Sequence, residues 1–296
     1  MAGQHIYRVG EARIARVQDC VLESFSPRQL LHEWREDHRK LLERMPETTT
    51  TDGRHLLMSV HSWVVWHSGK TIIVDTGVGN DKTRPFALYF DHLKTPYLDR
   101  LHQIGVLLEE VDYVLHTHLH VDHVGWNTTL VGGRWTPTFP NARHVFSARE
   151  YAWFTDPANL NERNRTSFQV QADSVTPIVE AGLVDMIEVT GKEIIPGFSF
   201  HPTPGHSVDH ASIVLESAGA RALFPGDLLH HPVEILAPEL PTIFDPDPER
   251  TLQSRRWALD FAADSGAIVF SSHFPATAAG RIARSGSGNG YEWHFV

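Results

Sequence analysis

Hydrophobic and polar positions change their spacing several times along the chain. Short apolar runs predict buried β-strands, among them LLMSVHSWVVW from residue 56, TIIVD from residue 71 and AIVFSS from residue 267. Helical patterns occupy residues 95–105 and 247–266. Strand and helix signals alternate, and several strands form hairpin-like pairs. This pattern predicts two mixed sheets packed together with helices outside, in a single domain over residues 1–296.

The first 50 residues form an N-terminal extension of this domain. Residues 5–18 predict one or two short strands, and Ser26-Pro27 is a helix start signal. Apolar residues then recur at helical spacing, which predicts an amphipathic helix carrying Leu30, Leu31, Trp34, Leu41, Leu42 and Met45. Such a helix covers the core, mediates a homodimer contact or forms a lid over a site, and the sequence leaves these alternatives open.

Composition narrows the class of protein. The formal net charge of −10 argues against a nucleic acid or an anionic membrane as the main partner. A single cysteine, Cys20, argues against a disulfide framework and a cysteine-rich zinc site. The N-terminus shows no basic-then-apolar signal, and no apolar run reaches the roughly 18 residues of a membrane span. We therefore expect a soluble, cytoplasmic protein.

The densest group of chemically active residues is HTHLHVDH, residues 116–123, where a predicted strand ends. Alternate residues of an extended backbone face one side, so His118 and His120 can point at one metal ion. Asp122 and His123 lie past the strand and can face a second ion. Imidazole and carboxylate groups are ligands that zinc accepts. So many of them in one short segment argue against a histidine-rich loop without a metal.

Three further candidates lie downstream, each where an apolar stretch meets a loop. His206 stands in TPGH, Asp227 in PGD and His273 in SSH. Sheet-based sites form at such strand ends. A lone histidine or aspartate in a loop is usually solvated or a cap. Together with the cluster, and in this order, the three residues predict a metal site.

The order HxHxDH, TPGH, GD and SH, with Asp75-Thr76-Gly77 upstream, resembles the metallo-β-lactamase superfamily over about residues 55–275. The resemblance implies an α+β fold, a four-layer αββα sandwich with a two-metal site between its sheets. It implies that metal 1 is held by His118, His120 and His206, metal 2 by Asp122, His123 and His273, and that Asp227 bridges the two.

The implied site carries a hydrolytic chemistry. Two divalent ions roughly 3.5–4 Å apart can share a hydroxide and lower the pKa of its parent water to near 7. That bridging hydroxide would attack a carbonyl or phosphoryl centre. In related lactonases the counterpart of Asp122 is thought to pass a proton to the leaving group, so the resemblance gives Asp122 a catalytic role beside Asp227. We expect zinc first, although manganese, cobalt and iron accept the same ligands.

Three residues are expected to support the ligands. Asp75 would accept the free N–H of a ligand imidazole, with a turn role at a strand end as the alternative. His116 is expected to pack or hydrogen bond, or to act in an outer shell. His210 stands where relatives often repeat a histidine, and we expect a supporting hydrogen bond from it.

Departures from the family pattern narrow the choice among branches of the superfamily. Cys20 lies far from any ligand, against the subclass with a cysteine in the second metal site, and His120 stands where flavodiiron relatives have Glu. The segment after His273 predicts a closing hairpin rather than the glutathione-binding helices of glyoxalase II. No inserted domain or basic surface of the nuclease relatives is visible. The remaining pattern is similar to acyl-homoserine lactonases and methyl-parathion-hydrolase-like enzymes.

Substrate contacts are the least readable part of the site. The lactonases of this branch carry a Tyr three residues after the bridging Asp, and this chain has His230 there. His230 can donate a hydrogen bond to a substrate oxygen, or it is a packing residue. Trp126 and Phe274 follow predicted ligands closely and could line the pocket, although core packing is the default for an aromatic residue.

The sequence thus predicts a dinuclear metal-dependent hydrolase that opens a lactone or cleaves a carboxylic ester or a phosphotriester. One alternative is a mononuclear iron enzyme similar to persulfide dioxygenases, and another is a non-catalytic sensing member of the fold. The expected partner is a small-molecule ester or lactone.

Overall fold

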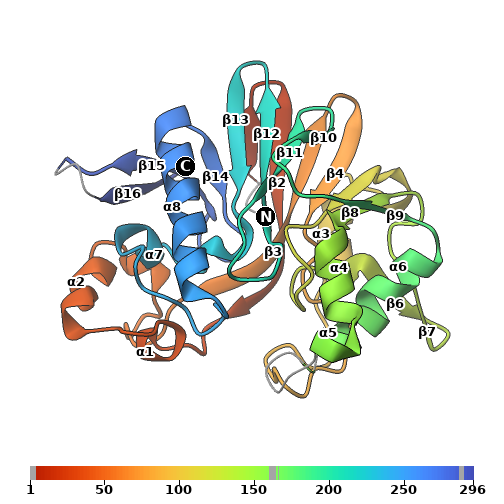
Figure 1. The fold of residues 1–296 in the computed structure, drawn as a ribbon, viewed down its shortest axis with the longest axis horizontal. Helices are drawn as coiled ribbons and strands as arrows, with labels where there is room; N and C mark the ends of the chain where they lie inside the picture. Colours follow the sequence, from red (N-terminus) through yellow and green to blue (C-terminus); the bar gives the residue numbers. More distant parts are fainter. Residues whose placement is uncertain (1–4, 160–164, 166, 287–289) are drawn as a thin grey trace. The chain divides into compact units, whose positions relative to one another are not determined.

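The computed structural model describes residues 5–159, 165, 167–286 and 290–296. The chain divides into two compact units, of which the first contains Met1–Cys20 and Val60–Glu188 and the second Val21–Ser59 and Val189–Val296. Strands and helices are both abundant, as the α+β prediction requires (Figure 1). In the part of the chain that is described, no helix combines the length and apolarity that a membrane span needs.

The first unit is built on a seven-stranded sheet with the order β1-β2-β3-β4-β5-β8-β9. Its strands are β1 (Ile6–Val9), β2 (Ala12–Leu22), β3 (Met58–His67), β4 (Lys70–Val74), β5 (Tyr113–Leu115), β8 (Arg143–Ser147) and β9 (Val184–Ile187). The helical segments are α3 (Tyr97–Gln103), α4 (Ala148–Thr155), α5 (Ser167–Val170), a π-helix (Gln171–Val175) and α6 (Thr176–Glu180). A separate hairpin pairs β6 (Thr128–Val131) with β7 (Arg134–Pro137).

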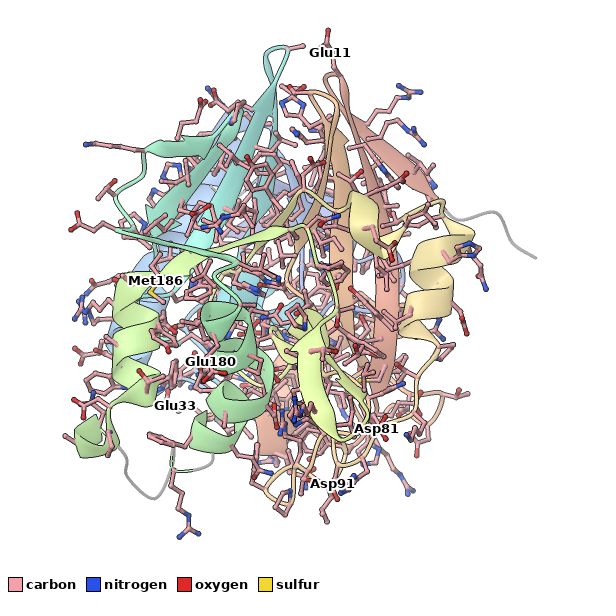
Figure 2. The ribbon with its side chains drawn as sticks, turned by 90° about the vertical axis from the view of Figure 1, so that its right-hand side faces the viewer. Glu11, Glu33, Asp81, Asp91, Glu180 and Met186 are labelled. Carbon is pink, nitrogen blue, oxygen red and sulfur yellow. The ribbon has the colours of Figure 1, made fainter. Side chains whose placement is uncertain are left out.

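Strand direction in the first unit explains where its polar residues gather. Strands β4, β5, β8 and β9 are parallel, with α3 between β4 and β5 in the chain. Parallel neighbours end at the same edge of a sheet, so the segments after β4 and β5 lie side by side. The segment after β4 begins at Asp75 and continues into the loop that carries Asp81 and Asp91 (Figure 2). The segment after β5 is the histidine cluster 116–123.

The second unit is built on the sheet β10-β11-β12-β13-β14-β15-β16. Its strands are β10 (Glu193–Ile195), β11 (Phe198–Pro202), β12 (Ala211–Ser217), β13 (Ala220–Phe224), β14 (Ile268–Phe270), β15 (Ala279–Arg284) and β16 (Tyr291–Phe295). Its α-helices are α1 (Pro27–Leu30), α2 (Arg39–Leu42), α7 (Val233–Leu236) and α8 (Pro248–Ser265). Helix α8 joins β13 to β14, which pair in parallel, and β15 and β16 form the predicted closing hairpin.

The predicted N-terminal amphipathic helix is wrong as a continuous element. The segment folds instead into α1, a 3₁₀ turn (Glu36–His38) and α2. Leu31 leaves the helical conformation to form a β-bridge with Thr242, and Glu33 adopts a left-handed φ of 63°. The apolar spacing is real, because Leu30, Leu31 and Trp34 are buried, but tertiary pairing overrides the local helical preference.

Candidate metal centre

In the first unit, the predicted ligands lie together just beyond β5. The ring centroid of His118 lies 4.5 Å from that of His120 and 4.1 Å from that of His123. Nε2 of His123 lies 3.9 Å from Oδ1 of Asp122. His118 and His123 are buried, whereas His120 and Asp122 are partly exposed. The geometry therefore gathers four metal-competent side chains on one short turn.

Asp75 orients two of these imidazoles. Nδ1 of His123 donates to Oδ2 of Asp75 at 2.9 Å. The Thr117 hydroxyl donates to the same oxygen at 2.8 Å, and Nδ1 of His118 lies 3.0 Å from that hydroxyl. An imidazole held through Nδ1 presents Nε2 to a metal ion. Thr117 was not singled out by sequence reasoning, because nothing in its position marks it apart from its neighbours.

His116 lies at the base of the cluster. Its Nδ1 is 3.1 Å from the carbonyl oxygen of His123, and its Nε2 is 3.5 Å from Nδ1 of His144. Burial lowers the pKa of His116 to about 4. A neutral imidazole that supports the backbone of His123 agrees with the packing and hydrogen-bonding alternative stated for it.

In the second unit, Asp227 is surrounded by imidazoles. Its Oδ1 lies 2.9 Å from Nε2 of His273, and its Oδ2 lies 3.3 Å from Nε2 of His206 and 3.4 Å from Nε2 of His230. Asp227 and His273 follow the parallel strands β13 and β14, which explains why they meet. A carboxylate whose two oxygens face different imidazoles has the arrangement that a bridging metal ligand requires.

The outer nitrogens of these imidazoles face oxygen atoms. Nδ1 of His273 lies 3.1 Å from the carbonyl oxygen of Ser59. Nδ1 of His206 lies 3.6 Å from Oδ1 of Asp245. The backbone N–H of Asp227 donates to Nε2 of His210 at 3.1 Å, while Nδ1 of His210 lies 2.9 Å from the Thr203 hydroxyl. His210 thus accepts a hydrogen bond from the backbone of Asp227.

His230 lies at the centre of the second unit's polar residues. Its ring stacks on that of His273 at 5.5 Å, and its Nδ1 lies 3.9 Å from Oε2 of Glu234. Burial alone would lower the pKa of His230, but the carboxylates of Asp227 and Glu234 raise it to about 10. His206, Asp227 and His230 also form a group whose ligand atoms lie within 4.8 Å of one another.

Two predicted substrate contacts lie in packed surroundings. Trp126 is buried and stacks on Tyr97 at 5.1 Å within the core of the first unit. Phe274 is fully buried and packs edge-on against Trp293 at 5.2 Å. Both rings therefore pack against other aromatic residues in the interior of their units. Proximity in sequence to a ligand does not place a side chain at its surface.

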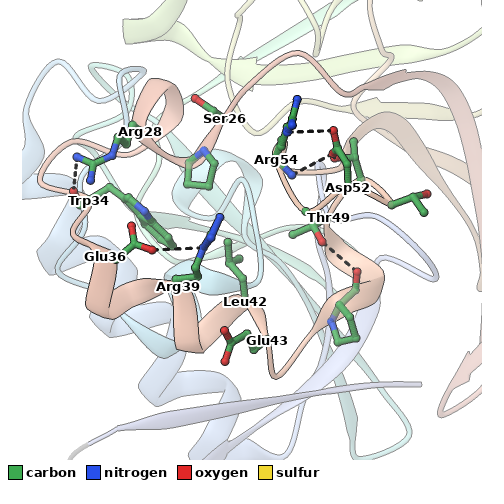
Figure 3. Close-up of a pocket in the computed structure, with 15 residues that line it drawn as sticks. Ser26, Arg28, Trp34, Glu36, Arg39, Leu42, Glu43, Thr49, Asp52 and Arg54 are labelled. Carbon is green, nitrogen blue, oxygen red and sulfur yellow. Dashed lines mark hydrogen bonds and ion pairs between the residues drawn. The ribbon is translucent and has the colours of Figure 1, made fainter.

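A separate pocket of about 570 Å³ lies in the second unit (Figure 3). Its lining residues fall between 26 and 54, where Arg39 pairs with Glu36 and Arg54 with Asp52 at its rim. Among the described residues that line it, none belongs to the predicted metal ligands.

The histidine and aspartate groups are candidates for binding divalent metal ions. The family model of the metallo-β-lactamase superfamily matches residues 56–273, and the chain therefore belongs to that superfamily. At this level it is a metallo-β-lactamase-type hydrolase, which agrees with the resemblance found in the sequence.

Comparisons with individual proteins agree with this assignment. An N-acyl homoserine lactonase of Bacillus cereus is 24% identical over 191 residues, or 60% of this chain and 67% of the lactonase. The crystal structure of hydrolase AbOPH of the β-lactamase superfamily matches with a TM-score of 0.84 and 24% identity, covering 100% of this chain and 98% of its own. AidC, a dizinc quorum-quenching lactonase solved with N-hexanoyl-L-homoserine, matches with a TM-score of 0.81 and 20% identity, covering 99% and 97%. These likenesses confirm the predicted fold.

Proposed function

We propose that this protein is a dinuclear metal-dependent hydrolase that opens a lactone or cleaves a carboxylic ester, with phosphotriesters as a further substrate class. The observation that carries the proposal is Asp227, whose two oxygens face the ligating nitrogens of His206 and His273 at 3.3 and 2.9 Å. The family match takes in all of the predicted ligands. In this proposal residues 1–296 act as one functional domain.

The ligand set is the one that the sequence motifs predict. His118, His120 and His206 would hold one ion, Asp122, His123 and His273 would hold the other, and Asp227 would be a ligand of both. The donors are imidazoles and carboxylates throughout, which suits zinc and also manganese, cobalt or iron. When bound, two such ions lower the pKa of a shared water to near 7 and polarise the oxygen under attack.

The chain's own side chains supply the remaining functions. Asp122, whose side chain is 16% exposed, would accept the proton released from the attacking water and pass it to the leaving group. His230 donates a hydrogen bond to a substrate oxygen. Asp75, Thr117 and His210 keep ligands in place through the hydrogen bonds described above. Lactonase activity in two similar proteins supports the lactone as the first substrate to test.

The test is proton release from the metal-loaded protein with acyl-homoserine lactones, γ-lactones, aryl esters, a phosphotriester, a β-lactam and lactoylglutathione. We expect one of the first four classes to turn over with kcat/KM above about 10⁴ M⁻¹s⁻¹. A single bound iron with oxygen uptake, or no turnover of any class, would contradict the proposal. The cytoplasmic location and a homodimer remain predictions, the second of which sedimentation can check.

A further inference from the structure

Arg255 is a fully buried cation on helix α8, and its guanidinium contacts the turn at Leu228, helix α7 and the loop that follows α7. Its Nε donates to the carbonyl oxygen of Leu228 at 2.7 Å. Its Nη1 donates to the carbonyl oxygens of Pro238 and Leu240, both at 2.8 Å. Its Nη2 donates to Oε1 of Glu234 at 2.7 Å. A planar fork of N–H donors is therefore needed here, which lysine does not supply.

The first branch of the Arg255 contacts, through Glu234, leads to the turn that carries His230. Glu234 is fully buried, and its Oε2 accepts the backbone N–H groups of His230 and His231 at 2.6 and 2.8 Å. Burial alone would raise the pKa of Glu234, but Arg255 and His230 lower it. The ionised carboxylate thus links Arg255 to the backbone on which the His230 ring is mounted.

The second branch leads to His206. Oδ2 of Asp245 accepts the N–H and O–H of Thr242 at 2.9 and 3.0 Å and lies 3.6 Å from Nη2 of Arg255. Oδ1 of Asp245 lies 3.6 Å from Nδ1 of His206, whose Nε2 faces Asp227. A carboxylate at Nδ1 favours the tautomer that leaves Nε2 available to a metal ion.

The third branch is the carbonyl of Leu228, the residue that follows Asp227. Burying a cation together with two carboxylates has a desolvation penalty. A protein with well-packed hydrophobic residues in place of such a group is often at least as stable. Stability alone therefore does not account for this group. The three branches lead to the segments of Asp227, His230 and His206, so a single side chain connects all three.

We propose that Arg255 is a positioning residue that, through Leu228 and Asp245, sets the orientation of Asp227 and His206 and thereby the metal affinity of the centre, and that through Glu234 it holds the turn of His230. The inference rests on the proposed function, which makes His206 and Asp227 metal ligands. It goes beyond that function because it assigns control of the metal affinity to residues that are neither proposed metal ligands nor proposed substrate contacts.

Zinc affinity, measured by competition with a chromogenic chelator, tests the proposal in D245N, R255K and a control, R256K. The side-chain amide of D245N would keep an oxygen for Thr242 but turn its NH₂ toward His206, favouring the wrong tautomer. We expect D245N and R255K to bind zinc about 10–100-fold more weakly. Arg256 is exposed on the same helix, so R256K should match the wild type.

The visible spectrum of the cobalt-substituted protein provides a second readout. We expect D245N to shift the ligand-field bands, because a rotated His206 changes the geometry around the ion, while R256K leaves them unchanged. If R255K does not fold, D245N still decides the matter. Wild-type affinity and spectrum in folded D245N would overturn the inference. Failure of the wild type itself to bind zinc or cobalt would overturn the proposed function instead.

Discussion

Asp75 accepts a hydrogen bond from Nδ1 of His123 at 2.9 Å, although the two residues are 48 positions apart in the chain. They meet because β4 and β5 are parallel neighbours that end at the same sheet edge. Asp75 also adopts a left-handed φ of 53°, a conformation that aspartate tolerates better than most residues. Its position and its backbone conformation together allow the Asp75 carboxylate to orient the histidine cluster.

Replacing Asp75 by asparagine should weaken metal binding without unfolding the protein. Asparagine tolerates the left-handed conformation and can still accept the N–H of Thr117, but its NH₂ opposes the N–H of His123. We expect about 10–100-fold weaker zinc affinity, measured by chelator competition. The matched control is D112N, since Asp112 accepts a backbone N–H from Thr71 far from the ligands. Equal affinities in the two variants would contradict the assigned role.

Replacing Asp227 by alanine should remove metal and activity together. The carboxylate contacts His206 and His273 with different oxygens, and in the proposed dinuclear centre its loss would take a ligand from each ion. We expect a loss of bound metal, measured by elemental analysis, and a kcat/KM at least about 100-fold lower. The exposed Asp264 provides the control D264A, which should keep both. Full activity in D227A would refute the shared site.

Replacing His230 by phenylalanine separates substrate binding from metal binding. We expect kcat/KM to fall by about 10-fold or more, since a hydrogen bond to a substrate oxygen is lost. Metal content should stay at the wild-type value. In H230Y, which restores the residue of the lactonases, the ratio of lactone to ester turnover should rise. Loss of metal in H230F would instead indicate that His230 is a metal ligand. This outcome is worth measuring because Nε2 of His230 lies 3.4 Å from Oδ2 of Asp227.

Replacing Gly125 by alanine should destabilise the turn after the histidine cluster. An added Cβ would lie 1.8 Å from the carbonyl oxygen of Val78, so the loop from Asp75 to Gly79 would have to move. We expect a loss of about 1–3 kcal/mol in the free energy of unfolding, measured in urea. A Cβ at Gly286 meets nothing within 4 Å, so G286A should be neutral. Equal stability of the two variants would contradict the close approach.

Lys82 should make stability depend on pH. Its Nζ donates to the Thr128 hydroxyl at 2.6 Å and to the Asp173 carbonyl at 2.9 Å, and burial lowers its pKa to about 7. Between that value and the ordinary pKa of about 10.4, the unfolded chain binds more protons than the folded one. The Lys82 contribution to the free energy of unfolding therefore rises with pH across this window.

Urea unfolding at pH 7 and pH 9 measures this contribution as a difference between variants. The wild-type free energy of unfolding minus that of K82M should increase from pH 7 to pH 9. Lys70 is exposed and paired with Asp112, so the same difference for K70M should stay constant. A constant difference for K82M would show that Lys82 stays charged in the folded protein.

Much of the fold was predictable because it depends on local pattern. The strands β3, β4 and β14 and the helix α8 occupy the segments that their apolar spacing indicated. The prediction of a continuous N-terminal helix was wrong because Leu31 pairs with Thr242, more than two hundred residues away. For Trp126 the sequence left both pocket lining and core packing open, and the structure places its ring in the core against Tyr97, a partner that no local pattern indicates.

The sequence by itself determined the family, the α+β class and the order of the metal-ligating residues, because strand ends and ligand spacing are local properties. Only the tertiary structure decided which groups hold those ligands in place. Thr117, Glu234, Asp245 and Arg255 are common polar residues without a motif, and their roles depend on distances across the fold. Burial removes water as a competing partner, so each of these groups must find its hydrogen bonds within the protein.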